Sequence, residues 1–405
     1  MADISKLIND INSEEARNAD FLHLTANENQ LSNLANKLLA SKLSERYYFG
    51  GGTGGIVDFG SYTFLGLPAV ENLVLNASDA LKKMTGAAVV NISCFSGLHA
   101  MMCAIMGVTK HGETILSLRF EDGGHGATKG IVENLGRKHQ YAKFDTKTLD
   151  FDLEETVKIY KESGASAIYI DISVHLKPIN VLGLRSALGE SAIIIFDASH
   201  SFGLMLGGQV VSPLLDGADV ICANTHKTFA GPQRGVVLFK DKDLGERADW
   251  LIKTTFTSSV NTAPLLALCV SLLEYEKFGK DYALQVVKNS RALAAAFVAL
   301  GLFVRQCDTN GFTNNEQVHV FVDNLGERVD LFKSLIKNNI SCNFMQILGG
   351  RPFARIGTQE ITRRGMGEED MTKVALLFSR AIRGENVQKD VVDFNRKFAD
   401  IKYSF

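Results

Sequence analysis

The chain has 405 residues, of which 46% are hydrophobic and 22% charged, and its formal net charge is −2. No stretch approaches the roughly 18 consecutive apolar residues of a membrane-spanning helix, and the near-neutral charge lacks the basic excess of a nucleic-acid binder. Because this length exceeds what one hydrophobic core usually serves, we expect two domains that act on small molecules, without nucleic acid or membrane as partner.

The N-terminal segment and the cysteines indicate the compartment. MADISKLINDINSEEARNAD has no basic stretch followed by an apolar one, so it does not resemble a signal peptide, and we expect a cytoplasmic protein. No CxxC pair and no zinc-like histidine spacing is present, which predicts reduced, mostly buried thiols and no metal site. The six cysteines are Cys94, Cys103, Cys222, Cys269, Cys307 and Cys342.

A glycine cluster, YYFGGGTGGIVDFG, fits the spacing G-x-G-x-x-G at Gly50, Gly52 and Gly55. A dinucleotide site needs an apolar strand before these glycines and a helix after them. The preceding KLLASKLSERYYF instead has a helical pattern, and no amphipathic helix begins at Gly55. We therefore predict a mobile or ligand-facing loop here.

From about residue 86 to 240, apolar runs alternate with helical segments, which predicts an α/β fold with a mostly parallel sheet. The runs are AAVVNIS, ETILSL, SAIYIDI, SAIIIFD, ADVICAN and GVVLF. A long helical stretch, 262–300, follows, and a second α/β pattern begins near QVHVFVD and ends in two helices, about 367–383 and 386–401. We predict an N-terminal arm (1–45), a large domain (46–280) and a smaller C-terminal domain (281–405).

Lys227, in NTHKTFAGPQRG, follows the run ADVICAN and so stands at the carboxyl end of a buried strand, where open α/β sheets bind ligands. Burial would keep its amine neutral and able to form a Schiff base with a carbonyl such as that of pyridoxal phosphate. Asp197 ends SAIIIFD in the same way, and a carboxylate there would keep a pyridine nitrogen protonated. A surface lysine and a turn-capping aspartate are the alternatives.

Two further segments complete the set. Ser96 and Gly97 begin the helical pattern SGLHAMMCAIMGV, whose free N–H groups suit a phosphate, although a simple N-cap serine explains them as well. His125 follows two glycines in EDGGHGATKG, where a lone histidine is more often structural. A phosphate cup, histidine, aspartate and lysine, each at a strand end, are together far more specific than any one of them.

Over about residues 20–385, the chain resembles the serine hydroxymethyltransferase family of fold-type I pyridoxal phosphate enzymes. The resemblance rests on NTHKTFAGPQRG, DASHSFGL, GGH, SGLHA, LTANENQLS and ARIGTQEITRRGM. It implies that Lys227 holds the cofactor, Asp197 pairs with the pyridinium nitrogen and His125 stacks on the ring. The other implied cofactor contacts are Ser96, Gly97, Leu98, Ser173, His200, Asn224 and His226.

The resemblance also implies substrate contacts. Arg355 matches the arginine that binds the substrate carboxylate, a task suited to its two-pronged donor. Asn27 stands where the family has a serine beside that carboxylate. Tyr47 matches a catalytic tyrosine that reaches across from the neighbouring subunit, which implies a homodimer with shared active sites.

Departures from the family pattern put tetrahydrofolate dependence in doubt. Phe49, in RYYFG, stands where the family's KYAEG supplies a glutamate, although an alignment slip would leave Glu45 as the acid. Gly126 replaces a leucine that packs on folate. The loop after Lys227 is one residue longer, so that either Gln233 or Arg234 replaces the family arginine. In addition, GTPAIT becomes GTQEIT, with Gln359 and Glu360.

With these departures, the resemblance implies an aldolase or transaldolase that makes or breaks the Cα–Cβ bond of a β-hydroxy-α-amino acid through a glycine quinonoid. An aldehyde would replace folate as the acceptor, and His125 or a water would take the β-hydroxyl proton. The alternatives are a tetrahydrofolate-dependent glycine/serine hydroxymethyltransferase and a non-catalytic protein that binds pyridoxal phosphate. Aminotransferase or racemase activity on the same fold fits the matched segments less well.

Overall fold

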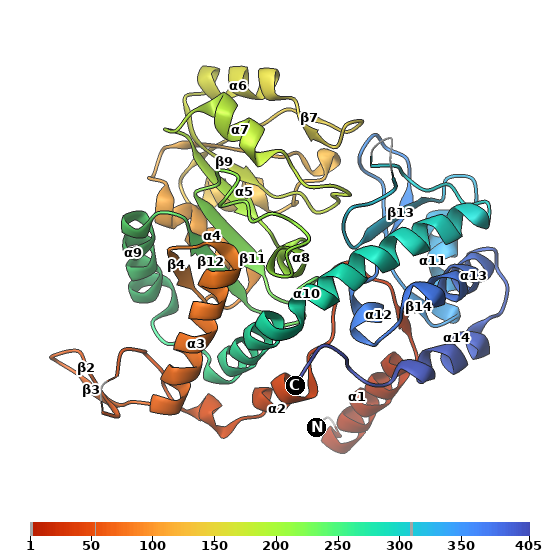
Figure 1. The fold of residues 1–405 in the computed structure, drawn as a ribbon, viewed down its shortest axis with the longest axis horizontal. Helices are drawn as coiled ribbons and strands as arrows, with labels where there is room; N and C mark the ends of the chain where they lie inside the picture. Colours follow the sequence, from red (N-terminus) through yellow and green to blue (C-terminus); the bar gives the residue numbers. More distant parts are fainter. Residues whose placement is uncertain (1–2, 53, 308–310) are drawn as a thin grey trace.

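The computed structural model describes residues 3–52, 54–307 and 311–405, and its largest element is a seven-stranded sheet (Figure 1). Six strands run parallel, and β12 runs antiparallel to both of its neighbours, which confirms the predicted mostly parallel sheet. The polar edge strand β6 was not predicted. In order across the sheet the strands are β4 (Val89–Asn91), β12 (Gly235–Phe239), β11 (Val220–Asn224), β10 (Ile193–Asp197), β9 (Ala165–Ile170), β5 (Thr114–Ser117) and β6 (Lys138–Tyr141).

Both faces of this sheet are buried, which explains why its central strands are continuous apolar runs. Along β9, Ala167 and Tyr169 enter one core cluster, and Ile168 and Ile170 enter the other. The first cluster lies under α4 (Gly97–Val108), α5 (Thr128–Asn134) and α9 (Lys242–Leu251). The second lies under α3 (Pro68–Thr85), α6 (Leu153–Glu162), α7 (Val181–Leu188), α8 (Phe202–Leu206) and the first part of α10 (Thr262–Ala299).

The helix α10 joins the large sheet to a second unit. Its residues from Leu265 to Val287 belong to the large core, whereas Leu293 and Phe297 belong to a C-terminal core. That core covers an antiparallel sheet of three strands, in the order β13 (Gln317–Phe321), β16 (Phe353–Gly357) and β15 (Asn343–Met345). The helices of this unit are α11 (Arg328–Lys337), α12 (Gln359–Arg363), α13 (Met371–Ile382) and α14 (Gln388–Asn395). The predicted domain limits remain predictions, because one unbroken helix spans the boundary.

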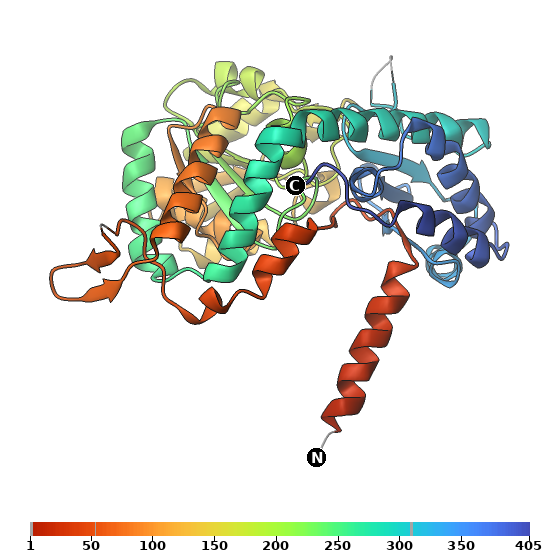
Figure 2. The ribbon, with the colours of Figure 1, turned by 60° about the horizontal axis from the view of Figure 1, so that its bottom comes forward.

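The N-terminal segment has two parts. Every residue of α1 (Ile4–Ala19) is exposed, and the helix points away from the body (Figure 2). The chain then pairs β1 (Leu22–His23) in parallel with β14 (Ile340–Ser341), which ties it to the C-terminal unit. The predicted single helix at KLLASKLSERYYF is instead α2 (Asn33–Leu39) and a 3-10 turn (Lys42–Glu45), because the Ser41 hydroxyl caps a new start.

The described glycines of the cluster, at 50–52 and 54–55, lie in a loop, as predicted, and the chain continues into a hairpin of β2 (Ile56–Asp58) and β3 (Thr63–Leu65) that extends from the body (Figures 1 and 2). A second small hairpin pairs β7 (Phe144–Asp145) with β8 (Asp150–Phe151). Short helical turns lie at Phe120–Asp122, Ile252–Thr257, Glu368–Asp370 and Arg396–Phe398. All six cysteines are buried, and among the described residues no helix is long and apolar enough to span a bilayer.

Candidate active site

A cavity of about 80 Å³ lies where the carboxyl ends of β9, β10 and β11 meet the start of α4. It brings together all of the predicted cofactor residues except Ser96 and His226, each of which is next in sequence to a lining residue. The lining residues are Gly97, Leu98, Met101, His125, Asp171, Ile172, Ser173, Asp197, Ser199, His200, Asn224 and Lys227. The sheet topology therefore gathers in one place the strand ends that the sequence pattern singled out.

The Lys227 side chain enters the cavity from the loop after β11. Burial lowers its pKa to about 8, partly offset by the Asp197 carboxylate, which favours the charged amine. Its Nζ lies 3.2 Å from Nε2 of His200, and its backbone carbonyl accepts a hydrogen bond of 2.7 Å from the Asn29 amide. About a tenth of this amine is therefore neutral at pH 7, far more than for an ordinary lysine, and a nucleophile requires the neutral form.

Asp197 lies at the end of β10 and lines the same cavity as Lys227. Its Oδ2 accepts a hydrogen bond of 2.8 Å from the Tyr169 hydroxyl, and its Oδ1 accepts one of 2.9 Å from the N–H of Ser199. Donors on both oxygens fix the plane of a carboxylate. Tyr169 was not predicted, since its position inside the apolar run SAIYIDI looks like that of any core residue.

The start of α4 has the features of an anion site. The Ser96 hydroxyl caps the helix by accepting a hydrogen bond of 3.1 Å from the N–H of His99. A Cβ on Gly97 would lie 2.9 Å from Cβ of Asn224, so glycine is what lets the helix start approach β11 this closely. Within the described part of the chain, Nδ1 of His226 is buried without a hydrogen-bond partner. A phosphate beside the free N–H groups of the first turn would satisfy these groups.

His125 is held at the cavity by a hydrogen bond from its backbone to Asp171. Its backbone N–H donates a hydrogen bond of 3.1 Å to Oδ2 of Asp171, which also accepts one from the Thr128 hydroxyl. Burial lowers the pKa of the His125 ring, which is therefore neutral near pH 7. Burial also raises the pKa of Asp171 to about 7. Asp171 follows β9 just as Asp197 ends β10, so the same strand-end signal could have identified it.

Arg355, on β16, brings the C-terminal unit to the site. One terminal nitrogen donates to the Ser173 carbonyl at 2.9 Å, and the other donates to Oδ1 of Asn343 at 2.9 Å and to Oδ1 of Asn27 at 3.3 Å. Among the described residues its buried Nε has no partner. The structure thus places two of the three predicted substrate residues, Asn27 and Arg355, in contact, whereas the third, Tyr47, lies elsewhere.

Glu316 and Gln317 lie behind His200 and were not predicted. The Gln317 amide donates to Oε1 of Glu316 at 2.9 Å, and Oε1 lies 3.8 Å from Nδ1 of His200. Glu316 is fully buried, and burial raises its pKa to about 7. The sequence signal was weak, because NNEQVHVF shows only a run of four polar residues at the start of a strand.

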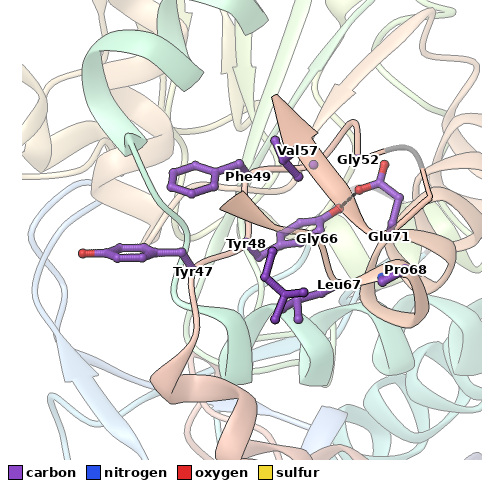
Figure 3. Close-up of a pocket in the computed structure, with 12 residues that line it drawn as sticks. Tyr47, Tyr48, Phe49, Gly52, Val57, Gly66, Leu67, Pro68 and Glu71 are labelled. Carbon is purple, nitrogen blue, oxygen red and sulfur yellow. Dashed lines mark hydrogen bonds between the residues drawn. The ribbon is translucent and has the colours of Figure 1, made fainter. Parts of the chain in front are cut away.

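The last predicted residue, Tyr47, does not reach the cavity of its own chain. Its side chain is 64% exposed, and its ring stacks on Phe49 at 5.6 Å and points away from the small pocket around Tyr48 and Glu71 (Figure 3). Phe49 packs at 4.6 Å on Phe64 of the hairpin. Glu45, the alternative acid, is exposed and does not line the cavity of its own chain either.

Two further departures from the family pattern have structural explanations. Arg234 is buried and donates to the backbone carbonyls of Asn261 and Ser93, whereas Gln233 is exposed. Gln359 donates to the carbonyls of Thr25 and Glu28, and so anchors the segment that carries Asn27 and Asn29. Arg234 and Gln359 therefore support the cavity through the backbone.

The chain was compared with known proteins. The family model for serine hydroxymethyltransferase matches residues 2–378. A fluorothreonine transaldolase from Streptantibioticus cattleyicolor is 34% identical over 91% of this chain, and the chain spans 58% of that relative's length. A serine hydroxymethyltransferase from Pyrobaculum islandicum is 32% identical, and the match covers 96% of this chain and 91% of that relative's length.

A solved structure is also similar over the whole fold. It is the crystal structure of L-threonine transaldolase from Pseudomonas fluorescens in its internal aldimine state, with a TM-score of 0.91 and 28% identity. The match covers 99% of this chain and 93% of that chain. This match confirms the predicted fold class.

Proposed function

Because the chain belongs to the serine hydroxymethyltransferase family of fold-type I pyridoxal phosphate enzymes, we propose that it makes or breaks the Cα–Cβ bond of a β-hydroxy-α-amino acid. We further propose that an aldehyde, rather than tetrahydrofolate, is the acceptor. The observation that carries this choice is Phe49, whose ring packs with Tyr47 and Phe64 where the family pattern has a glutamate. Similarity to two proteins described as transaldolases supports the same choice.

The residues of the cavity fit pyridoxal phosphate. Lys227 and Asp197 line one cavity, and the start of α4, with the unpartnered Nδ1 of His226, suits its phosphate. Ser96, Gly97 and Leu98 would hold that phosphate, while Ser173 and His200 would lie near the ring hydroxyl. When bound, the cofactor supplies an aldehyde for Schiff-base formation and a ring that withdraws electrons from the substrate Cα.

Lys227 and Asp197 have complementary roles in this proposal. The neutral fraction of the Lys227 amine would attach the cofactor, because burial lowers its pKa to about 8. Asp197, fixed by Tyr169 and Ser199, would keep a proton on the ring nitrogen. The protonated ring would then be a better acceptor for the electrons of the substrate bond.

Arg355 and Asn27 would orient the amino acid. Arg355 donates to the carbonyl of Ser173, which lines the cavity, and to Asn27, and a guanidinium can bind a carboxylate through two parallel hydrogen bonds. Fixing the carboxylate sets which bond to Cα stands perpendicular to the ring. His125, neutral near pH 7, would accept the β-hydroxyl proton directly or through a water.

The proposal includes a homodimer with shared sites. Tyr47 is exposed on its own chain, and the neighbouring hairpin exposes Ile56, Phe59 and Leu65 by more than half. Such an apolar projection is typical of a surface that another subunit covers. In the dimer Tyr47 would complete the partner's cavity, next to the acceptor.

One experiment tests the reaction. The purified holoenzyme is incubated with glycine or threonine and a panel of aldehydes, or with serine and tetrahydrofolate, and the products are identified by mass spectrometry. We expect new β-hydroxy-α-amino acids from the aldehydes without folate, and none from Lys227→Ala. Turnover only with folate would establish the hydroxymethyltransferase instead. No turnover in either assay, with cofactor bound, would indicate a non-catalytic protein.

A further inference from the structure

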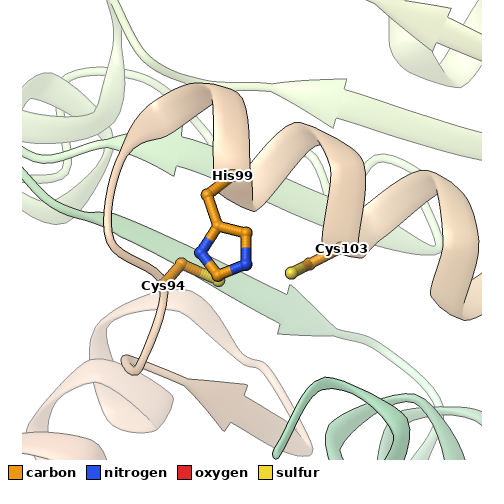
Figure 4. Close-up of side chains that lie close together, drawn as sticks. All are labelled: Cys94, His99 and Cys103. Atoms are coloured by element: carbon orange, nitrogen blue, oxygen red, sulfur yellow. The ribbon is translucent and has the colours of Figure 1, made fainter. Parts of the chain in front are cut away.

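Cys94, His99 and Cys103 form a cluster at the start of α4 (Figure 4). One ring nitrogen of the histidine and the two sulfur atoms all lie within 4.8 Å of one another. His99 and Cys103 are four residues apart on α4, so they lie on the same helix face, and Cys94 comes from the loop between β4 and α4. The prediction of no metal site rested on spacings along the chain, which do not show this convergence in space.

We propose that Cys94, His99 and Cys103 bind a soft divalent cation of the zinc class. Tetrahedral zinc, with bonds of about 2.3 Å to sulfur and 2.0–2.1 Å to nitrogen, holds its ligand atoms roughly 3.5–3.8 Å apart. The three atoms lie within 4.8 Å of one another, a slightly wider span, so small side-chain rotations suffice to reach that geometry. A water or a small thiol would occupy the fourth position.

A disulfide accounts for the cluster less well. It would need the two sulfur atoms at about 2.05 Å, and it would leave the histidine without a role. Two thiolates and one imidazole are instead the ligand types that select zinc over magnesium or calcium. The convergence of all three side chains therefore favours a cation.

The surroundings allow a cation to enter and be retained. The two thiols are fully buried in the apolar core under α4, whereas His99 is partly exposed and lies on the side of entry. The His99 ring stacks on Phe95 at 5.2 Å, and Nδ1 accepts a hydrogen bond of 3.0 Å from the N–H of Phe95, which leaves Nε2 for the cation. On binding, the Nε2 proton moves to Nδ1, the Phe95 hydrogen bond is lost, and the two thiols release their protons.

The site would brace the loop that presents the phosphate cup, because Ser96 and Gly97 lie between Cys94 and His99. This consequence rests on the proposed function, whereas cation binding itself does not. We expect the cation-free protein to bind pyridoxal phosphate about tenfold more weakly, an effect of the size seen for supporting residues around ligand sites.

The test uses the holoenzyme in a phosphine reductant, dialysed against a chelator and titrated with Co²⁺. We expect one tetrahedral Co²⁺ per chain, seen by red-light absorption away from that of the cofactor and displaced by one Zn²⁺. The double variant C94S/C103S should lose this signal, and Cys342→Ser, a buried thiol of the C-terminal unit, should keep it.

Circular dichroism would show whether the double variant folds. If it does not fold, His99→Ala replaces it and should weaken Zn²⁺ binding at least tenfold. The proposal is overturned if wild type binds no Co²⁺, or if the folded double variant binds it as wild type does. A Cys94–Cys103 disulfide in wild type purified without reductant, found by mass spectrometry, would also overturn it. Activity is not part of this test, so its failure leaves the proposed function standing.

Discussion

The side-chain nitrogen of Lys227 lies 3.2 Å from Nε2 of His200, and Nδ1 of the same histidine lies 3.8 Å from Oε1 of Glu316. These three buried groups form a line that leads away from the cavity. Burial and the positive charge of Lys227 hold the pKa of His200 well below its usual range, so the histidine is neutral. The lysine is therefore backed by a neutral ring and by a carboxyl group that titrates near pH 7.

Glu316→Gln should change how stability depends on pH. Burial raises the Glu316 pKa from 4.5 to about 7, so the folded protein holds a proton there that the unfolded chain releases above pH 4.5. Its contribution to stability is full below about pH 4.5 and is lost as pH rises through 7. Between pH 5 and pH 8, the free energy of unfolding of the variant should therefore rise by on the order of 2–3 kcal/mol relative to that of wild type.

Urea unfolding of both proteins, with cofactor bound, at these two pH values measures the difference. Lys227 and Arg355 act on Glu316 in the opposite direction, since their charges favour the carboxylate. A stability difference between the two proteins that does not change with pH would show that Glu316 is already ionised in the folded state.

Gly97→Ala should weaken cofactor binding. The new methyl group would lie 2.9 Å from Cβ of Asn224, and overpacking of this kind costs about 1–3 kcal/mol, or roughly 5- to 150-fold in affinity. Gly130→Ala is the matched control, because a Cβ there meets nothing within 4 Å. Fluorescence titration of the apoproteins with pyridoxal phosphate compares them, and equal affinity in both variants would refute a phosphate site at the start of α4.

Arg355→Lys should raise KM for the amino acid more than it lowers kcat. A lysine keeps the charge but cannot bind a carboxylate through two parallel bonds, and a lost charged hydrogen bond costs about 1.5–3 kcal/mol, roughly 10- to 150-fold in KM. Arg305→Lys, which changes an arginine stacked on Phe321 outside the cavity lining, should leave KM unchanged. Steady-state kinetics across amino-acid concentrations separates the two constants. If the Arg355 variant had a normal KM, another group would bind the carboxylate.

Asp197→Asn should lower kcat at least about 100-fold while cofactor remains bound, because a neutral amide cannot hold the ring nitrogen protonated. The amide keeps the size of the carboxylate, but its single oxygen can accept only one of the Tyr169 and Ser199 hydrogen bonds. Tyr169→Phe, which removes only one of those donors, should have a smaller effect. The rates are compared at saturating cofactor. Equal losses in both variants would assign Asp197 a purely structural role.

The parts of the fold that could be read from the sequence are those where one periodicity dominates. Continuous apolar runs identified the buried strands, because both faces of that sheet are covered. The polar edge strand β6 carries no such pattern, since its KHQY side chains are partly exposed. The direction of β12 could not be predicted either, because an apolar run has the same pattern in a parallel and in an antiparallel strand.

Strand-end chemistry was predictable, whereas contacts that depend on spatial neighbours were not. Lys227, Asp197 and Gly97 stand at ends of elements, and local sequence marks such ends. Glu316 and Tyr169 join the site only because the C-terminal unit and β9 bring them there. The Cys94–His99–Cys103 cluster was not predicted for the same reason, because a loop and a helix turn bring its three side chains together.

The central claim is that Lys227 carries pyridoxal phosphate opposite Asp197. Borohydride reduction of the holoenzyme, followed by proteolysis and peptide mass spectrometry, tests it most directly. We predict one phosphopyridoxyl group per chain, on the Lys227 side chain, and none covalently attached in Lys227→Ala. A reduced cofactor on another lysine, or a wild-type protein that takes up no cofactor, would contradict the account.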